Sequence, residues 1–490
     1  MKFKLQKIIK YVILLLITIY LGLFLLNQSI YLTNSPFWIF LLILTTFLTI
    51  VFIVIEDFKL FKINIIILII SLLPILFSTN IIHSKSYSNL LNIKKVELKK
   101  EKLDFKFTRV FNKNMATKKI NKIIGQKING VSISTQFEVN PDNAFVQIFK
   151  NKLVWIFPLD YSGFFKWLKQ DYIPGYVILD ATDEKAEPKL ILDYKIKYSK
   201  NSFFLQNISR KAYFESNLGL YDYHMEINDN GKPFYIVTLL QPQINIFGEL
   251  PTFDILLIDA QTGETKKINK EDLNKKEYKW IDRIFSENIL KKRIKDYGIY
   301  KKGYFNSLFT KENVYVPTTY KNSELWLLEL NNKLYWFTGM TSINKKDQSL
   351  VSFLLVDAKK NKGLEVSLNN VTDENGAIEI VDSALGSDGI KWESVLPQPF
   401  IYKNEFYWIV TIKSNNDIFQ KIGILKGDST DVKFVKSSKD LINVLENKTI
   451  NDNLNTKNIN SKDTIIVNKK IYLEILKKIE ELNSLKKQLK

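Results

Sequence analysis

The sequence predicts an α+β protein: three membrane-spanning helices at the N-terminus, then tandem helix-plus-antiparallel-sheet modules, then a C-terminal helix. Two observations lead to this fold class. The first part of the 490-residue chain is dominated by Ile, Leu, Phe, Val and Thr. Beyond it, a hydrophobic strand ending in an acidic turn recurs, most clearly as DILLIDAQTGE at residues 254–264.

Three N-terminal segments are long and apolar enough to cross a membrane. Each supplies about 20 mostly apolar residues without a charge, which suffices for a hydrocarbon core of about 30 Å. The segments are Tyr11–Leu32, Pro36–Ile55 and Ile63–Ile82. Lysines precede the first segment and separate the second from the third, so the positive-inside rule puts both stretches in the cytoplasm. Residues 1–83 are therefore predicted as a multi-pass anchor, with the bulk of the chain on the extracytoplasmic side.

A strongly basic segment follows the third span. Residues 85–127 hold thirteen Lys and Arg against three acids, and such a segment is drawn to anionic lipid by roughly 1 kcal/mol per charge near the surface. Residues 84–130 are predicted as a juxtamembrane segment with a helix; a solvated linker is the alternative. Because no recognised nucleic-acid motif accompanies the charge, nucleic acid is not expected as a partner. The formal charge of +19 on the whole chain has a second explanation in the Lys and Asn usage of an AT-rich genome.

One strand pattern recurs four times beyond the basic segment. In each copy, a hairpin with an aromatic second strand is followed by a strand that ends in an acidic turn. The corresponding aromatic positions are Trp155, Tyr235, Trp336 and Trp408, and the acids that follow them by 20 to 25 residues are Asp180, Asp259, Asp357 and Asp428. Asn and Gly between the first two strands favour tight hairpin turns, because they tolerate positive φ. Each copy is thus predicted as a four-stranded meander whose Asp caps the last turn.

The copies divide the body into four modules, each expected to carry a helix because an isolated hairpin is marginally stable in water. The modules are residues 131–200, 201–280, 281–372 and 373–446. The candidate helices are Ala116–Ile128, Phe203–Ser216, Ile281–Tyr297, Ala377–Leu385 and Ser438–Leu445. A flexible linker at 447–465 and an amphipathic helix at 466–490 complete the chain. The apolar stripe of that last helix suits self-association, docking on the sheets or contact with a membrane.

The phrase LLIDAQTGETKKI at residues 256–268, with the aromatic hairpin before it, resembles PepSY-type modules. The whole chain is similar to bacterial membrane-anchored proteins that join a few spans to a soluble part containing PLDYSGFFKWL and PGYVILDAT, found here within residues 158–182. The resemblance implies small helix-plus-antiparallel-sheet units in a protein of the bacterial cytoplasmic membrane. It also implies binding or inhibition of a peptidase as one role.

The chain offers few groups for catalysis. It has no Cys, which excludes thiolate metal sites and thiol nucleophiles. Its two histidines, His83 and His224, have no second His at a metal-ligand spacing, so a structural or surface role is expected for each. The repeated carboxylates belong to separate modules, which favours turn capping over acid–base catalysis. No catalytic, metal or cofactor site is predicted, and enzyme activity is not expected.

The most unusual local segment is DYSGFFKWLKQDYIPGY at residues 160–176. Four of its aromatic residues crowd between the strands of module one: Phe164, Phe165, Trp167 and Tyr172. We expect them to cover the first sheet as a short amphipathic helix; a surface for a ligand or partner is the alternative.

These features favour a membrane-anchored, extracytoplasmic, non-enzymatic binding or scaffold protein with a protein partner in the cell envelope. The resemblance supplies one alternative, a regulator or inhibitor of an extracytoplasmic peptidase. The spans supply another, an accessory or sensor subunit of a membrane transport system. A stand-alone transporter is not favoured, because the spans hold no charged residue that would mark a pathway.

Overall fold

The computed structural model describes residues 9–10, 12–13, 15–17, 35–100, 103, 109–125, 127–128, 131–216, 221–244, 248–269, 271–321, 324–344 and 348–446. Most of the first expected span, Tyr11–Leu32, lies outside these residues. The expected linker at 447–465 and the expected helix at 466–490 lie wholly outside them. Residues 1–441 form one compact unit, to which the following description applies.

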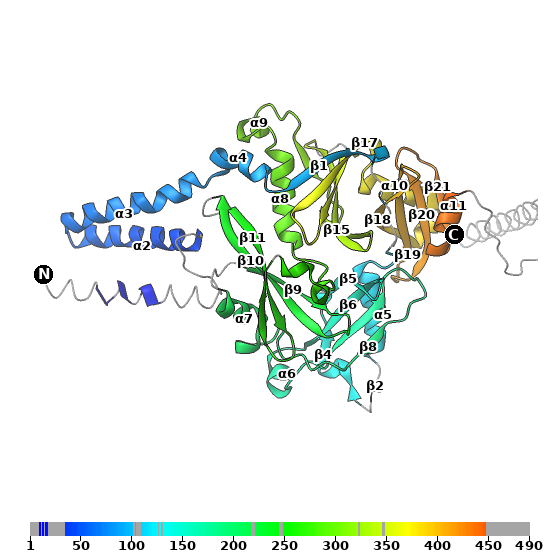
Figure 1. Cartoon of the computed structure of the whole chain (residues 1–490), viewed down its shortest axis with the longest axis horizontal. Coiled ribbons are helices and arrows are strands. Elements are labelled where there is room, and N and C mark those ends of the chain that lie inside the picture. The colour runs from blue at the N-terminus through cyan, green and yellow to red at the C-terminus, as the bar shows by residue number, and fades with distance from the viewer. Residues whose placement is uncertain are drawn as a thin grey trace, which may run out of the picture. The chain divides into compact units, whose positions relative to one another are not determined.

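Two apolar helices precede the sheets. Helix α2 (Ser35–Val54) and helix α3 (Phe58–Phe77) pack together, and the Asn64 side chain of α3 donates hydrogen bonds to the Thr45 carbonyl (2.8 Å) and the Thr49 hydroxyl (2.9 Å) of α2. The segments Phe37–Val54 and Phe58–Ser88 are long and apolar enough to cross a membrane, and most of their side chains are not buried within the protein. The second includes α4 (Asn80–Ser88), which leads into the body (Figure 1).

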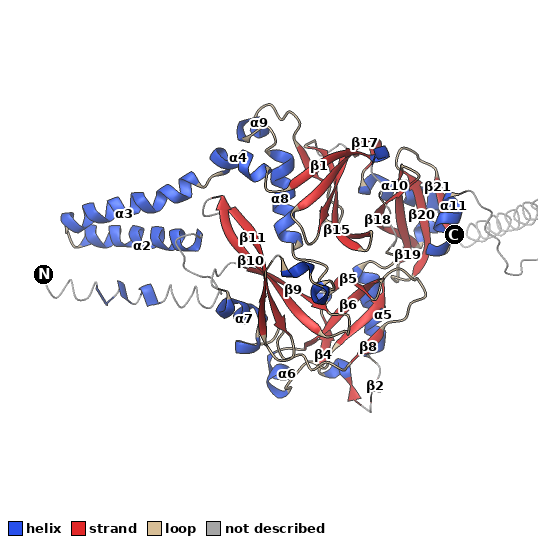
Figure 2. Ribbon diagram, viewed as in Figure 1, coloured by secondary structure: helices blue, strands red, loops and turns tan. Residues whose placement is uncertain are grey.

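Four sheets build the body, as Figures 1 and 2 show. Sheet one comprises β4 (Phe137–Val139), β5 (Phe145–Phe149), β6 (Lys152–Tyr161), β7 (Tyr176–Asp180) and β8 (Lys189–Ile191). Sheet two is the meander β9 (Tyr221–Ile227), β10 (Pro233–Ile244), β11 (Gly248–Asp259) and β12 (Thr265–Ile268). Sheet three contains β13 (Tyr315–Pro317), β14 (Trp326–Leu330), β15 (Lys333–Ser342), β16 (Ser349–Asp357) and β17 (Lys362–Thr372). Sheet four is the meander β18 (Trp392–Tyr402), β19 (Glu405–Ser414), β20 (Phe419–Lys426) and β21 (Val432–Val435).

The basic segment contributes a strand that the sequence did not predict. Strand β1 (Asn92–Glu97) pairs in parallel with β17, with Val96 opposite Val366, and so becomes the edge of sheet three. A short hairpin of β2 (Lys127–Ile128) and β3 (Val131–Ser132) follows later. Residues 84–130 are therefore more than a linker with a helix: part of this segment belongs to a sheet whose other strands lie more than 200 residues away.

The hairpin turns have the backbone conformation that the sequence predicts. In the hairpins β5–β6, β14–β15 and β18–β19, two consecutive turn residues take positive φ: Lys150 and Asn151, Asn331 and Asn332, Lys403 and Asn404. Positive φ at both central residues is the geometry of a type I′ turn, whose twist matches that of the flanking strands. In sheet two the corresponding turn uses Gly231, at φ 90°. The predicted hairpins and four-stranded meanders are confirmed.

One helix precedes each meander, with different limits from those expected. The helices are α5 (Lys113–Ile124), α7 (Ile208–Glu215), α8 (Glu287–Ile299) and α10 (Glu374–Leu385). Each begins where a side chain caps it: Asn112, Asn207, Ser286 and Asp373 accept hydrogen bonds from backbone N–H groups three residues later. The shorter helices are α6 (Phe164–Lys169), α9 (Tyr304–Leu308) and α11 (Leu441–Leu445).

Buried polar contacts join sheet one to sheet two and sheet two to sheet three. The Gln147 amide of β5 donates to the Ile227 carbonyl (2.6 Å) and accepts from the Ile227 N–H (2.9 Å) on β9. Next to it on β9, the Glu226 carboxylate accepts from the backbone N–H groups of Asp282 (2.8 Å) and Arg283 (3.0 Å), just before α8. Burial raises the pKa of Glu226 to about 7.

Two further contacts complete the connection. Between sheets three and four, the Phe337 and Trp408 rings meet edge to face with centroids 6.2 Å apart. Between sheet four and the segment before α5, Gln398 of β18 accepts from the Arg109 N–H (3.0 Å) and donates to the Arg109 carbonyl (2.5 Å). The contacts between the four modules therefore close a cycle.

Candidate functional site

The four aromatic repeat positions lie on β6, β10, β15 and β19, the second strand of the four-stranded meander in each sheet. In the strand pairing, Trp155 lies opposite Leu179, Tyr235 opposite Ile258, Trp336 opposite Val356 and Trp408 opposite Leu425. None of the four aromatic side chains is more than 6% exposed. The chain thus uses these positions for the core of each module.

The tryptophans at these positions make the same hydrogen bond. The indole N–H of Trp155 donates to the Phe111 carbonyl (3.0 Å), and Phe111 directly precedes the capping residue of α5. In the same way Trp336 donates to the Phe285 carbonyl (3.1 Å) before α8, and Trp408 to the Thr372 carbonyl (2.9 Å) before α10. In sheet two, the Tyr235 hydroxyl instead accepts from the Lys200 N–H (3.3 Å). The indole therefore fixes the start of a helix on the sheet.

The Asp-Ala pair closes the third strand of the first three meanders, which is β7, β11 and β16. Asp180, Asp259 and Asp357 each accept hydrogen bonds from backbone N–H groups two or three residues later, which makes them turn caps. The following alanines are fully buried, and their carbonyls accept N–H groups from the segment before the helix of the same module. These alanines are Ala181, Ala260 and Ala358.

Asp428 does not occupy the corresponding position in sheet four. Asp180, Asp259 and Asp357 each pair with the strand residue just before the repeat aromatic, whereas Tyr407, the residue before Trp408, pairs with Lys426. Gly427 then takes the place of the alanine, donating its N–H to Phe406 and accepting from Thr372. The prediction for Asp428 is wrong, because the spacing between residues in the sequence does not show which residues pair across neighbouring strands.

The ion pair beside this turn is reversed in sheet four. Lys152 pairs with Asp180 (3.1 Å) and Lys232 with Asp259 (2.5 Å). At the same two register positions, sheet four has Glu405 and Lys426, 2.7 Å apart. The attraction between strands is kept although both charges are exchanged.

The aromatic segment after β6 does not cover sheet one as expected. Helix α6 buries none of its side chains, and Phe165 is 77% exposed. Phe164 and Trp167 instead form ring contacts with Phe203 and Phe204, and Phe204 itself is 72% exposed. Tyr172 makes none of the ring contacts of this group; the Lys195 ammonium lies 5.0 Å from its ring centre. The interpretation as a sheet cover is therefore wrong, because these rings pack on one another at the surface.

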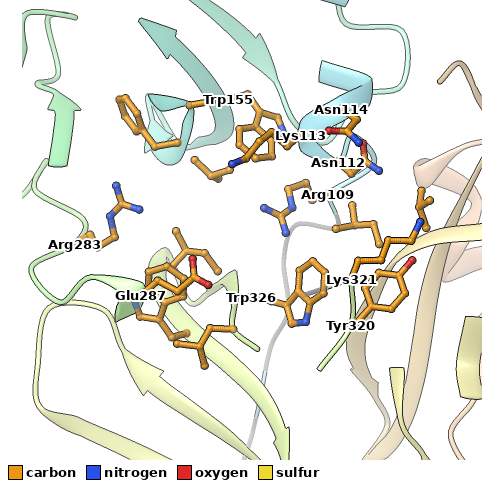
Figure 3. Close-up of a pocket in the computed structure, with 18 residues that line it drawn as sticks. Arg109, Asn112, Lys113, Asn114, Trp155, Arg283, Glu287, Tyr320, Lys321 and Trp326 are labelled. Atoms are coloured by element: carbon orange, nitrogen blue, oxygen red, sulfur yellow. The ribbon is translucent and has the colours of Figure 1, made fainter. Parts of the chain in front are cut away.

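A cavity of about 390 Å³ lies where modules one, three and four meet. Its apolar wall comes from edge strands β5 and β14 and from core tryptophans. This wall includes Phe145, Val146, Trp155, Trp326, Leu327 and Trp336. Figure 3 shows the cavity with the polar side chains of Arg109, Arg283 and Glu287 around it. The start of α5 contributes Asn112, Lys113 and Asn114 to one side.

Arg109 is the central polar group of this cavity. Its side chain lies between Trp155 and Trp326 (Figure 3), with the guanidinium carbon 5.5 Å from the Trp155 ring centre. The residue is only 6% exposed, and its Nε has no hydrogen-bond partner. Among the described residues, no carboxylate forms an ion pair with it. Burial lowers the pKa of Arg109 to about 10, so the guanidinium stays protonated at neutral pH.

The other charged residues of the lining are mainly basic. Arg283 lies across the cavity from Arg109 (Figure 3), and burial lowers its pKa, opposed by the nearby acids. Lys113 and Lys321 lie at the cavity as well, and Glu287 is the one acid among the lining residues. The buried Tyr320 hydroxyl, also in the lining, has no hydrogen-bond partner. The cavity thus presents unsatisfied donors and positive charge between aromatic walls.

The histidines stand apart from this cavity. His224 Nε2 lies 3.0 Å from Glu226 Oε1, and burial holds the pKa of His224 well below its usual value. His83 is half-buried on α4. Within the described ranges, no group of three or more His, Asp or Glu side chains gathers closely enough to hold a metal ion.

Sequence reasoning missed the cavity because its lining comes from separate segments without a motif. Arg109, Arg283, Tyr320 and Leu396 are far apart in the chain. The sequence did contain one signal, which is that the chain has far fewer arginines than lysines. In a Lys-rich protein, an arginine therefore indicates a position that needs the planar donors of a guanidinium. No protein-family model matches the chain, and no curated protein matches it.

Proposed function

We propose that the chain is a membrane-anchored, non-enzymatic binding protein whose body holds a small organic anion in the Arg109 cavity. The ligand class has one carboxylate or similar oxyanion and an aromatic body. The anion would lie against Arg109, with the aromatic part against the apolar wall of the same cavity.

The carrying observation is the buried Arg109 guanidinium, with which no carboxylate of the described residues forms an ion pair. A charge removed from water is costly unless it is paired, and the planar fork of arginine matches an oxyanion. Arg283 and Lys113 add positive charge around the same space. The exposed first turn of α5 adds the partial positive charge of a helix N-terminus. Together these features favour an anion over a neutral ligand.

The anchoring part of the proposal rests on α2 and α3. Both are apolar, and their side chains are mainly exposed, as expected for helices that face lipid. We place the body on the extracytoplasmic side of a bacterial cytoplasmic membrane, following the lysine distribution and the PepSY-like pattern. Binding of a small anion there suits a sensor or a subunit that works with an envelope protein partner. The basic segment, which includes β1, is proposed to contact anionic lipid.

The binding proposal is tested by titration calorimetry on the full chain in lipid nanodiscs. The probes are three acids with their amides: N-acetyl-phenylalanine, indole-3-acetate and 4-hydroxyphenylacetate. At least one acid should bind more than about tenfold more tightly than its amide, a difference of about 1.4 kcal/mol. If no acid in the set binds more tightly than its amide, the proposal fails.

Matched lysine variants localise the effect. Lys113→Met removes a charge at the cavity, whereas Lys118→Met removes an exposed charge elsewhere on α5. Lys113→Met should weaken binding of the acid and leave binding of the amide unchanged, and Lys118→Met should change the binding of neither. Arg109→Lys keeps the charge but loses the planar fork, so it should weaken the acid as well. Equal effects of the two lysine variants would contradict the assignment of the cavity.

A further inference from the structure

We propose that the segment Tyr304–Phe309, which we call the α9 wedge, inserts into the lipid interface of the leaflet from which α3 emerges. This inference rests on the proposed membrane anchoring but adds a contact that the spans do not supply. The wedge exposes three large apolar side chains: Phe305 (63%), Leu308 (50%) and Phe309 (76%).

The exposed rings form one continuous surface. Tyr304 and Phe305 have centroids 5.8 Å apart, and Phe305 and Phe309 stack at 6.4 Å with planes 7° apart. Tyr300 stacks on Tyr304 on the other side, at 6.2 Å. The row therefore begins with two tyrosines, Tyr300 and Tyr304, and ends with two phenylalanines, Phe305 and Phe309. This order suits the membrane interface, where aromatic rings lie between head groups and acyl chains.

Hydrogen bonds attach the wedge to the helix that continues α3. The Ser84 hydroxyl of α4 accepts from the Tyr304 N–H (3.2 Å), and the Asn80 amide of α4 donates to the Tyr300 hydroxyl (3.1 Å). Gly303, at φ 88°, makes the turn into the wedge. Figure 1 shows α9 beside α4.

The distance from the apolar helix suits the interface. Helix α3 ends at Phe77, but the apolar helical segment continues through Ile81 and Ile82 at the start of α4. Ser84 lies two residues beyond Ile82, about 3 Å along a helix with a rise of 1.5 Å per residue. The polar head-group layer is about 5–8 Å thick on each side of the core. Ile81 and Ile82, on the intervening turn, are 49% and 55% exposed. The apolar surface therefore continues from α3 toward the wedge.

The surrounding charges suit anionic head groups. Lys85 on α4 and Lys311 after the wedge are exposed, and Lys302 is exposed although it pairs with Glu312. Lysines beside aromatic residues are typical of interfacial anchors. Another exposed aromatic surface, around Phe204, has no hydrogen bond to α4 among the described residues, and we therefore use it as the reference.

The test uses the natural absence of cysteine in the chain. Full-length single variants Phe309→Cys, Ile67→Cys and Phe204→Cys are labelled with a nitroxide and reconstituted in phosphatidylcholine–phosphatidylglycerol vesicles. Collision rates with oxygen and with a water-soluble nickel chelate then report immersion in lipid. Ile67 lies on α3 with its side chain 40% exposed, so its label reports the anchor itself.

We expect the ratio of oxygen to nickel collisions to be severalfold higher at position 309 than at 204, and highest at 67. A lipid-like signal at 67 with a water-like signal at 309 would overturn the wedge and leave the anchor intact. A signal at 309 shielded from both reagents would indicate a protein partner and also overturn it. A water-like signal at 67 would reject the anchor and the wedge together.

Discussion

At the level of single residues, the repeated tryptophan connects a sheet with the start of a helix. Its ring fills the core, and its one polar atom needs a partner there. Trp155, Trp336 and Trp408 find that partner in the carbonyl just before a helix cap. A phenylalanine would fill much of the same space but leave the carbonyl without a donor.

Trp408→Phe should therefore lower the free energy of unfolding by about 2 kcal/mol, the cost of leaving a largely buried acceptor unsatisfied. The measurement is urea unfolding of the detergent-solubilised chain. Tyr407→Phe on the same strand is the control, because its hydroxyl bond to Glu405 is exposed, and it should cost less than about 0.5 kcal/mol. A Trp408→Phe variant as stable as Tyr407→Phe would contradict the role of the indole.

Asp160 provides a pH-dependent residue. Burial raises the pKa of this carboxyl from 3.8 to about 6, despite hydrogen bonds from the Tyr161 N–H and the side chains of Asn143 and Asn201. Between these pH values the folded state binds more protons than the unfolded state, so its stability falls as pH rises.

Asp160→Asn removes that titration. Relative to the wild type, the free energy of unfolding of the variant should rise by about 2–3 kcal/mol between pH 4 and pH 7, since each unit of pKa shift corresponds to about 1.4 kcal/mol. Urea titrations across this range measure the difference. Asp142→Asn, on an exposed residue nearby, should leave the wild-type slope in place. A constant difference between wild type and Asp160→Asn would refute the raised pKa.

At the level of elements, each module is a capped helix followed by a meander, and its local parts were predictable. Alternating strands and Asn-containing turns act over a few residues, so the hairpins could be recognised in the sequence. The fourth copy was misread, since Glu405 and Lys426 reverse the charges found at Lys152 and Asp180. A pattern search for the acid then selected Asp428.

The reversed pair predicts a compensating exchange. Glu405→Lys places two lysines opposite each other and should lower the urea midpoint. The double variant Glu405→Lys with Lys426→Asp restores opposite charges in the orientation of the other sheets, and should regain most of the loss. If the double variant is no more stable than Glu405→Lys, the pair does not hold this turn.

At the level of the whole molecule, buried polar contacts and one aromatic contact join the four modules in a cycle. Gln398 is the contact that brings module four to the cavity, since its amide holds both backbone groups of Arg109. Gln398→Leu would leave that N–H and carbonyl buried without partners, at a cost of about 2–4 kcal/mol. Binding of the acid probes should weaken in parallel.

The control for this change is Gln420→Leu on the same sheet, whose amide bond to Ile418 is exposed. It should alter neither stability nor binding appreciably. Loss of stability without loss of binding in Gln398→Leu would mean that ligand binding by Arg109 does not depend on the two hydrogen bonds from Gln398 to its backbone.

The features that could not be predicted are the non-local ones. Strand β1 was missed because its lysines, Lys94 and Lys95, indicated a solvated segment, whereas its partner strand lies some 270 residues later. The cavity was missed because packing, not a motif, brings Arg109 to Trp326. The segment around Phe165 was predicted to cover sheet one, because amphipathic spacing indicates an apolar face but does not show what that face contacts.

The most direct test of the account is to locate an anion in the cavity. Crystals of the full chain soaked with 4-bromophenylacetate would give an anomalous signal from bromine. The account predicts a bromine peak inside the cavity, against its apolar wall, with the carboxylate density at the Arg109 guanidinium. Bromine peaks only elsewhere, or an Arg109 side chain paired with a carboxylate of the protein, would contradict it.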